Sequence, residues 1–271
     1  MRNIFAFIFL GFGCLSCSKN DTASPSAIDY NQYKIKTATH SLRNYSGTTS
    51  SISFDTTLYV YDGTTCKYTR KQNNNTVEYI ATLSNGLYTQ VSYVNGVLSS
   101  QKVYYQLNAA GYIDSNWITN NTTVAQSSKN HYNADGSLAT AISYYQTYTN
   151  RVQYNYKNGI ANYAHSQRIA HIPSITNASD SVVYEYTNLP YRAGFYSTGL
   201  PVSFTGKPAK NLLQKTTYYD KLNNNAIRQT IEYQYQTNEI GLVTRRVLNI
   251  HTQPGNALVQ TDTTAYTYYG K

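Results

Sequence analysis

LYTQVSYVNGVLSSQKVYYQL, residues 87–107, is the stretch of sequence that decides the fold. Two runs rich in Val, Tyr and Thr flank the dipeptide Asn95-Gly96. Asn-Gly supplies the two residues of positive φ that a type I′ turn requires, and the twist of this turn matches the twist of paired strands. The stretch therefore predicts a β-hairpin.

Glycine turns of the same kind recur along the chain, at Tyr59–Gly63, Asn85-Gly86, His131–Gly136 and Tyr154–Gly159. The segments between them have short polar connections, which permit neighbouring segments to pair antiparallel, whereas parallel strands need crossovers of about a dozen residues. No segment shows the sustained i, i+3, i+4 apolar spacing of an amphipathic helix. We therefore predict an all-β protein built as an antiparallel meander of consecutive hairpins.

The expected strands cover most of the chain after residue 32. They are 33–37, 51–61, 66–71, 77–83, 87–94, 97–107, 112–119, 123–132, 138–148, 151–156, 160–167, 214–219, 227–235, 242–251 and 257–269. The second of them has the clearest alternation, because its apolar residues occupy every other position over most of its length. These apolar residues are Ile52, Phe54, Leu58 and Val60. The alternation predicts a strand with one face buried and the other in water.

The strand pattern breaks between residues 170 and 213. This range holds four of the six prolines of the chain, at 173, 190, 201 and 208. Proline is excluded from central strands because it cannot donate a hydrogen bond to the ladder. We therefore expect an irregular loop insertion at about 170–213.

Tyrosine dominates the aromatic composition, since the 271 residues include 30 Tyr, 7 Phe and 1 Trp. Most aromatic side chains therefore carry a hydroxyl that must reach water or a hydrogen-bond partner, which suits a sheet covered on one side. All-β folds of this size often form one domain, and we expect a single domain over residues 31–271. Long open sheets tend to curl, which predicts a strongly twisted half-barrel or barrel-like shape. A membrane-spanning barrel is the alternative, and it requires outward apolar bands with aromatic girdles.

The charge of the chain is positive but dispersed. The 22 Lys and Arg residues exceed the 13 Asp and Glu residues, giving a net charge of +9. The basic residues lie in no run longer than two. This distribution indicates solvated strand faces, and nucleic acid is not an expected partner.

The first residues resemble a bacterial lipoprotein signal. A short positive start precedes an apolar run from Ile4 to Phe12 that is too short to span a bilayer, and Leu15-Ser16-Cys17 follows. We expect residues 1–16 to be removed, Cys17 to carry lipid, and residues 17–30 to form a flexible tether. The protein would then be anchored to the outer membrane, facing the periplasm or the cell exterior. Two alternatives stay open, namely lipidation at Cys14 and a plain secretory peptide that is cleaved elsewhere.

Cysteine usage agrees with this processing. The mature chain would keep only Cys17 and Cys66, and no intrachain disulfide can form when Cys17 is lipidated. Cys66 lies in an alternating segment, so we expect it to be a small buried hydrophobic residue.

No catalytic constellation is evident in the sequence. The five histidines, at 40, 131, 165, 171 and 251, lack the spacing of a zinc site, and no phosphate loop, dinucleotide fingerprint or nucleophile elbow occurs. We therefore expect neither an enzyme nor a metal or other cofactor. Asp180 and Glu185 are the best pair of carboxylates for glycoside hydrolysis, which is the catalytic alternative.

Two segments carry a resemblance to a known family, 206–213 (GKPAKNLL) and 230–246 (TIEYQYQTNEIGLVTRR). Here the chain is similar to a group of Gram-negative bacterial lipoproteins that carry a domain of unknown function with a porin-like fold. It is more loosely similar to tyrosine-aspartate repeats of the form Tyr-x-Tyr-Asp-x-x-Gly. The chain departs from those repeats at Tyr-Lys-Asn-Gly and Tyr-Val-Asn-Gly, which replace turns containing Asp. The resemblance implies a lipid-anchored, porin-like barrel and assigns no catalytic residue.

The irregular segment 184–204 is the expected ligand site, because loops that interrupt a repeating fold often carry function. Its candidate residues are Tyr184, Tyr186, Tyr191, Arg192, Phe195 and Tyr196. Flat tyrosine rings can stack on sugars while hydroxyls and a guanidinium bond to the ring substituents, so a polysaccharide is the expected ligand. The alternative is that these residues plug one end of the barrel. A role as a structural or assembly partner of an outer-membrane protein also stays open.

Overall fold

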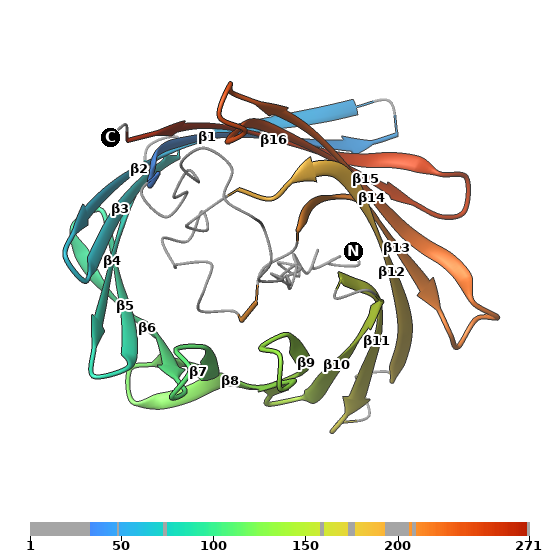
Figure 1. The fold of residues 1–271 in the computed structure, drawn as a ribbon, viewed down its shortest axis with the longest axis horizontal. Coiled ribbons are helices and arrows are strands. Elements are labelled where there is room, and N and C mark those ends of the chain that lie inside the picture. Colours follow the sequence, from blue (N-terminus) through green and yellow to red (C-terminus); the bar gives the residue numbers. More distant parts are fainter. Residues whose placement is uncertain are drawn as a thin grey trace, which may run out of the picture.

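The described part of the chain forms an all-β barrel of sixteen antiparallel strands. Figure 1 shows the barrel in a view down its axis. The computed structural model describes residues 33–47, 49–72, 75–157, 160–172, 177–192, 206–207 and 210–269. No helix in these ranges is long and apolar enough to cross a membrane.

The strands follow one another closely along the chain. They are β1 (Ile35–Ser46), β2 (Thr49–Asp62), β3 (Thr65–Gln72), β4 (Asn75–Ser84), β5 (Leu87–Val94), β6 (Val97–Leu107), β7 (Ile113–Asn120), β8 (Thr123–Tyr132), β9 (Leu138–Tyr145), β10 (Tyr148–Lys157), β11 (Ile160–Ala170), β12 (Ala178–Pro190), β13 (Asn211–Asp220), β14 (Ala226–Thr237), β15 (Val243–Thr252) and β16 (Ala257–Tyr268).

Each strand pairs with its neighbours in sequence, and β1 pairs with β16 to close the barrel. In this closing ladder His40 lies opposite Thr264, and on the other side of β1 the same residue lies opposite Asp55. Closure leaves no edge strand whose backbone groups lack a partner. The predicted all-β meander is confirmed, and the sheet closes fully.

The range 170–213 contains more regular structure than the sequence indicates. β12 lies within it, and each of the other strands corresponds to an expected one. Pro190 is the last residue of β12, a position where a missing backbone N–H is tolerated. Regular structure therefore extends further into this range than the sequence predicts.

The two ends of the barrel differ in their connections. The loop end holds Tyr33, Tyr269 and the connections 63–64, 85–86, 108–112, 133–137, 158–159, 191–210 and 238–242. The turn end holds 47–48, 73–74, 95–96, 121–122, 146–147, 171–177, 221–225 and 253–256. The hairpin between β1 and β2 is drawn faint in Figure 1, so the view is from the loop end. At the turn end, Asn95 and Gly96 have φ values of 50° and 81°, which confirms the predicted type of hairpin turn.

Three loops at the loop end share the sequence Asn-x-x-Gly-x and one conformation, namely 108–112, 133–137 and 238–242. In each, the backbone N–H of Asn donates to the carbonyl of the fifth residue, at 2.7, 2.8 and 2.9 Å respectively. The glycine N–H donates to the Asn carbonyl at 2.9 Å in all three. The glycine φ lies between 81° and 84°, where a side chain would be strained. The shared sequence of these three loops therefore corresponds to a shared turn conformation.

A tyrosine latch recurs in four hairpins: a tyrosine near the loop end of the second strand bonds to the start of the first strand. The hydroxyl donates to a backbone carbonyl at 2.6 to 2.8 Å in every case. The pairs are Tyr132 with Ile113, Tyr156 with Leu138, Tyr186 with Ala161, and Tyr268 with Val243. These bonds fix the register of each hairpin at the end where its strands are not joined by a turn.

On β2 the two faces are the reverse of the usual arrangement in a water-soluble sheet. On β2, Ile52, Phe54, Leu58 and Val60 point outward and are between 44% and 60% exposed. The alternate residues Asp55, Thr57 and Tyr59 point inward and are at most 8% exposed. Alternation on this strand was correctly expected, but the apolar face is the exposed one. The interior of the barrel is polar and aromatic.

We expect Tyr156→Phe to lower the free energy of unfolding by about 1 kcal/mol, because the buried Leu138 carbonyl loses its hydroxyl donor. Urea denaturation measures this change. The matched control is Tyr144→Phe, whose side chain lies outside and is exposed, and its effect should stay within about 0.5 kcal/mol. Equal effects of the two substitutions would show that the latch does not contribute to stability.

Candidate functional site

Tyrosines line the inside of the barrel on nearly every side. Because paired residues share a face, the strand registers place these tyrosines on the same face as the buried Tyr59. They include Tyr59, Tyr61, Tyr68, Tyr79, Tyr88, Tyr105, Tyr154, Tyr184, Tyr218, Tyr233, Tyr235 and Tyr266. Four of them form a continuous stack across β2, β3 and β4. Ring centroids are 6.5 Å apart for Tyr61 and Tyr59, 5.6 Å for Tyr59 and Tyr68, and 4.5 Å for Tyr68 and Tyr79.

Burial keeps the hydroxyls of Tyr59, Tyr68 and Tyr218 neutral. It raises the pKa of Tyr59 and Tyr68 above the ordinary value and raises the pKa of Tyr218 to about 12. Cys66 lies beside the stack, free and buried as expected, and burial raises the pKa of its thiol to about 11. The wall therefore offers hydroxyl groups and flat rings, and its thiol is unreactive.

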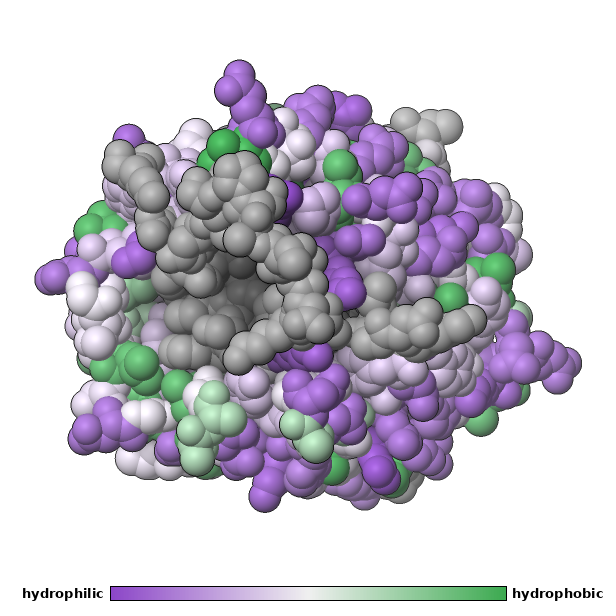
Figure 2. Space-filling view, viewed as in Figure 1, coloured by the Kyte–Doolittle hydropathy of each residue, from purple (hydrophilic) through white to green (hydrophobic). Residues whose placement is uncertain are grey.

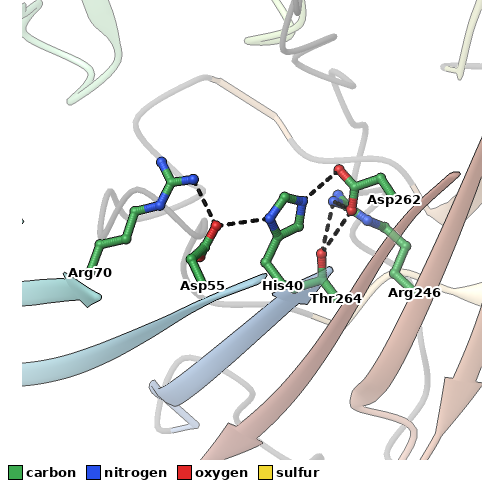
Figure 3. Close-up of polar contacts among 6 residues, drawn as sticks. All are labelled: His40, Asp55, Arg70, Arg246, Asp262 and Thr264. Atoms are coloured by element: carbon green, nitrogen blue, oxygen red, sulfur yellow. Dashed lines mark hydrogen bonds and ion pairs between the residues drawn. The ribbon is translucent and has the colours of Figure 1, made fainter. Parts of the chain in front are cut away.

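A chain of charged side chains lies on the inward face among the tyrosines, and we call it the lumen network (Figure 3). It consists of Arg70, Asp55, His40, Asp262 and Arg246. Arg70 Nη2 lies 2.7 Å from Asp55 Oδ2, which lies 3.0 Å from His40 Nδ1. His40 Nε2 lies 3.1 Å from Asp262 Oδ2, and Arg246 Nη2 lies 3.9 Å from Asp262 Oδ1. The network crosses β3, β2, β1, β16 and β15, and so crosses the closing ladder.

Thr264 completes the contact between Arg246 and Asp262. Its hydroxyl accepts a hydrogen bond from Arg246 Nη2 at 3.4 Å and donates to Asp262 Oδ1 at 3.3 Å. Within the network the exposed fraction of the side chain is 40% for Arg70, 32% for Arg246 and 23% for His40. The cationic groups are therefore accessible from the interior, while Asp55 is almost fully buried.

The network favours the protonated form of His40. The hydrogen bond to Asp262 raises the pKa of His40, and this effect outweighs burial, which acts to lower it. Burial acts to raise the pKa of Asp262, but the hydrogen bond from His40 and the charge of Arg246 outweigh it, so this pKa lies below its ordinary value. An imidazolium between two carboxylates satisfies all three groups.

We expect the stabilising contribution of His40 to depend on pH. Its pKa is raised in the folded protein, so the contribution is complete below the ordinary histidine pKa of about 6.5 and is lost as pH rises through the higher folded value. The loss of unfolding free energy caused by His40→Asn should therefore shrink as pH rises from about 5 to about 9. Denaturant titrations across this range measure it, with His131→Asn on the exposed outer face as the control. A difference that does not change with pH would contradict the assignment.

Both ring nitrogens of His40 contact carboxylates, so in this arrangement neither is free to take a proton from another group. The carboxylate pair considered for glycoside hydrolysis, Asp180 with Glu185, lies on opposite faces of β12. Asp180 pairs with Asp220 on the inward face of β12, whereas Glu185 pairs with Lys215 on the outward face. No group of three or more potential metal ligands occurs among the described residues.

A second charged cluster lies inside the barrel near the turn end. Asp180 Oδ2 lies 3.1 Å from Arg228 Nη2. Burial raises the pKa of Asp180 above its ordinary value, although Arg228 acts to lower it. This cluster shows that inward charges occur on both sides of the barrel.

Four of the six candidate ligand residues lie within the described residues. Tyr184 is on β12 opposite Thr216, on the inward face, and Tyr186 belongs to a tyrosine latch. The backbone N–H of Tyr191 donates to the Lys210 carbonyl at 2.7 Å, which closes the base of the loop 191–210. The structure therefore joins Tyr184 to the tyrosine-lined wall.

Arg192 spans from the base of that loop to the loop 238–242. Its Nη1 donates to the Ile240 carbonyl at 3.2 Å, and its Cδ would lie 3.1 Å from a Cβ added at Gly241. The other candidates, Phe195 and Tyr196, and the expected lipidation site Cys17 lie outside the described residues.

Sequence reasoning missed the lumen network because its members come from opposite ends of the chain. Asp55 and Asp262 each lie on an alternating strand, at a position on the same face as the tyrosines of that strand. This pattern was the sequence signal for inward-facing carboxylates. The signal becomes informative only when the register of β1 with β16 is known, since that ladder brings the two carboxylates to either side of His40.

Comparison with protein-family models finds no match, and comparison with curated proteins finds none either. Solved structures do match. A porin-like protein from Bacteroides uniformis superposes with a TM-score of 0.56 and 13% identity, over 87% of this chain and 96% of that one. The protein has a porin-like fold. A porin-like protein from Bacteroides vulgatus gives a TM-score of 0.53 with 10% identity, over 85% of this chain and 98% of that one. At these identities the likeness is one of fold, and it confirms the porin-like barrel that the sequence resemblance implies.

Proposed function

We propose that this porin-like barrel is a non-catalytic binding protein of the bacterial outer envelope whose inward face binds a polysaccharide. The observation that supports it most directly is the lumen network set among tyrosine rings, of which Tyr59 is buried while Tyr235 and Tyr266 are partly exposed. The interior is therefore not purely apolar, because a buried cluster around Tyr59 lies beside charged side chains that are 23% to 40% exposed.

The chemistry of the wall suits a sugar chain. Tyrosine rings provide flat apolar faces for the C–H faces of sugar rings, and their hydroxyls bond to sugar hydroxyls. Tyr233 and Tyr235 lie with their rings nearly parallel, at an interplanar angle of 4° and a centroid distance of 6.4 Å. Tyr235 pairs with Arg246 in the ladder, so a ligand stacked on this ring would meet the guanidinium. The pairing of β14 with β15 thus places a ring face and a hydrogen-bond donor next to each other on the inward face.

The charge of the network indicates which polysaccharides fit. Two guanidinium groups and the imidazolium of His40 face two carboxylates, which leaves a small positive excess. A strongly anionic polymer would have to compete with Asp55 and Asp262 for these cations. A neutral or weakly acidic polysaccharide binds without breaking the ion pairs and is the ligand we propose.

The outer wall supports a barrel that stands in water. Lys129 and Glu232 occupy outward positions near the middle of their strands, and both are exposed. Each charge at the midplane of a bilayer would cost roughly 2–4 kcal/mol, somewhat less for the acidic residue. Figure 2 shows the loop end of the barrel, where hydrophilic residues predominate over the coloured surface and hydrophobic residues are scattered among them. We therefore propose attachment to the outer membrane through lipid on Cys17, in place of a membrane-spanning wall.

Glycan binding is tested with a glycan array and a matched pair of variants. We expect the intact protein to bind soluble polysaccharide and Tyr235→Leu to bind about tenfold more weakly, because the inward ring provides a stacking face. Tyr144→Leu, on the outer face, should bind like the unsubstituted protein. Absence of binding to any glycan, together with co-purification of an outer-membrane protein, would favour an assembly partner instead.

The anchor is tested separately, by mass spectrometry of the N-terminal peptide of protein isolated from its own membrane. We expect an N-terminus at Cys17 that carries acyl chains, because the apolar run and Leu15-Ser16-Cys17 form a lipoprotein signal. Acylation at Cys14 would move the site by three residues. An unmodified N-terminus would contradict a lipid anchor.

A further inference from the structure

The large hydrophobic residues that are exposed concentrate at one end of the barrel. Of the sixteen such residues in the described part of the chain, ten lie in a connection at the turn end or within one residue of a strand terminus there. At the loop end, only Leu189 and Tyr269 among the described residues meet the same criterion, and the remaining four of the sixteen are on β2. We call the ten residues the apolar rim.

The apolar rim surrounds the opening and is not a single patch. Six of the eight connections at the turn end contribute to it, from the β5–β6 hairpin round to the β15–β16 hairpin. One residue from each hairpin represents it, namely Val97, Val124, Tyr144, Ile169, Leu222 and Leu258. Val97 is the most exposed, at 71%. Apolar side chains spread over six hairpins around the opening fit a flat surface better than a compact partner.

Polar and basic groups accompany the ring. The turns at this end place Asn residues at their tips, among them Asn95, Asn121 and Asn256, all with positive φ. Exposed basic residues also lie at the turn end, either in a turn or within three residues of a strand terminus. They include Arg43, Lys71, Arg151 and Lys221. The described acidic residues in the same zone, Glu78, Asp180 and Asp220, are not among the exposed residues.

We propose that the turn end of the barrel inserts its apolar rim into the headgroup region of a lipid bilayer that contains anionic lipids. Aliphatic side chains at turn tips gain by leaving water for the boundary of the acyl chains, while Asn and basic residues remain among the headgroups. A second copy docked rim to rim would bring the same cations face to face, which disfavours self-association. The positive charge at the turn end therefore favours an anionic bilayer over a second copy of the protein as the binding partner.

This contact is independent of lipid on Cys17. The described chain begins at Tyr33, at the loop end, so the residues before it join the barrel at the end opposite the rim. The proposal therefore adds a second membrane contact to any anchor, and it holds whether or not the interior binds a polysaccharide.

The first experiment places a tryptophan reporter at each end of the full chain, with Cys14→Ala and Cys17→Ala present so that no acyl chain is attached. Trp117 is the single tryptophan of the chain, and Trp117→Phe removes its signal. Val97→Trp then reports on the apolar rim, and Leu189→Trp is the matched reporter at the loop end. With vesicles of phosphatidylglycerol and brominated phosphatidylcholine, we expect quenching at position 97 and none at position 189. Equal quenching at both positions, or none at 97, overturns the proposal.

The second experiment measures binding of the full chain with Cys14→Ala and Cys17→Ala to sedimented vesicles. We expect Val97→Asn with Leu98→Asn to weaken binding to phosphatidylglycerol vesicles about tenfold or more, because two aliphatic side chains no longer insert. Leu189→Asn should leave binding unchanged, and far-UV dichroism checks that each variant remains folded. Unchanged binding of the rim variant, or a rim buried in a concentration-dependent dimer without vesicles, overturns the proposal.

Discussion

The pairing of β1 with β16 is the interaction on which the rest of the structure depends. It joins the first and last described strands and turns a long open sheet into a barrel without exposed edges. It also fixes which residues meet at the seam, because His40 lies opposite Thr264 on one side and opposite Asp55 on the other. The lumen network spans this seam. The ion pairs therefore reinforce the ladder that brings them together, and barrel closure and the candidate site share one set of contacts.

Closure also gives the two faces of the sheet different environments. Once the sheet is a barrel, every inward side chain competes for a limited volume, whereas outward side chains have ample room. Tyrosine suits the inside because its ring packs against neighbours and its hydroxyl bonds to backbone carbonyls, as in the latch between Tyr156 and Leu138. The high Tyr content of the chain thus has a structural basis as well as the binding role we propose.

The sequence predicts those parts of the fold that depend on local interactions. Asn95-Gly96 and the Asn-x-x-Gly loops determine their own turns, so the hairpins are predictable one at a time. β12 was not predicted, because Pro190 suggests a loop. Pro190 is the last residue of β12, where the missing N–H does not interrupt the strand. Alternation shows that Ile52 and Phe54 share a face but cannot show whether that face is inside, since this depends on closure. The lumen network depends on the same long-range pairing and was beyond prediction for the same reason.

The two ends of the barrel have different constraints, and their differences bear on function. At the loop end the Asn-x-x-Gly loops and the contact of Arg192 with Ile240 satisfy backbone groups through a dense set of hydrogen bonds. At the turn end two-residue turns such as Asn95-Gly96 leave flanking aliphatic side chains without cover. Folding alone does not require Val, Leu and Ile at these positions, because polar residues satisfy such turns equally well. An apolar rim on a barrel whose wall is polar is therefore best explained by a surface that it contacts.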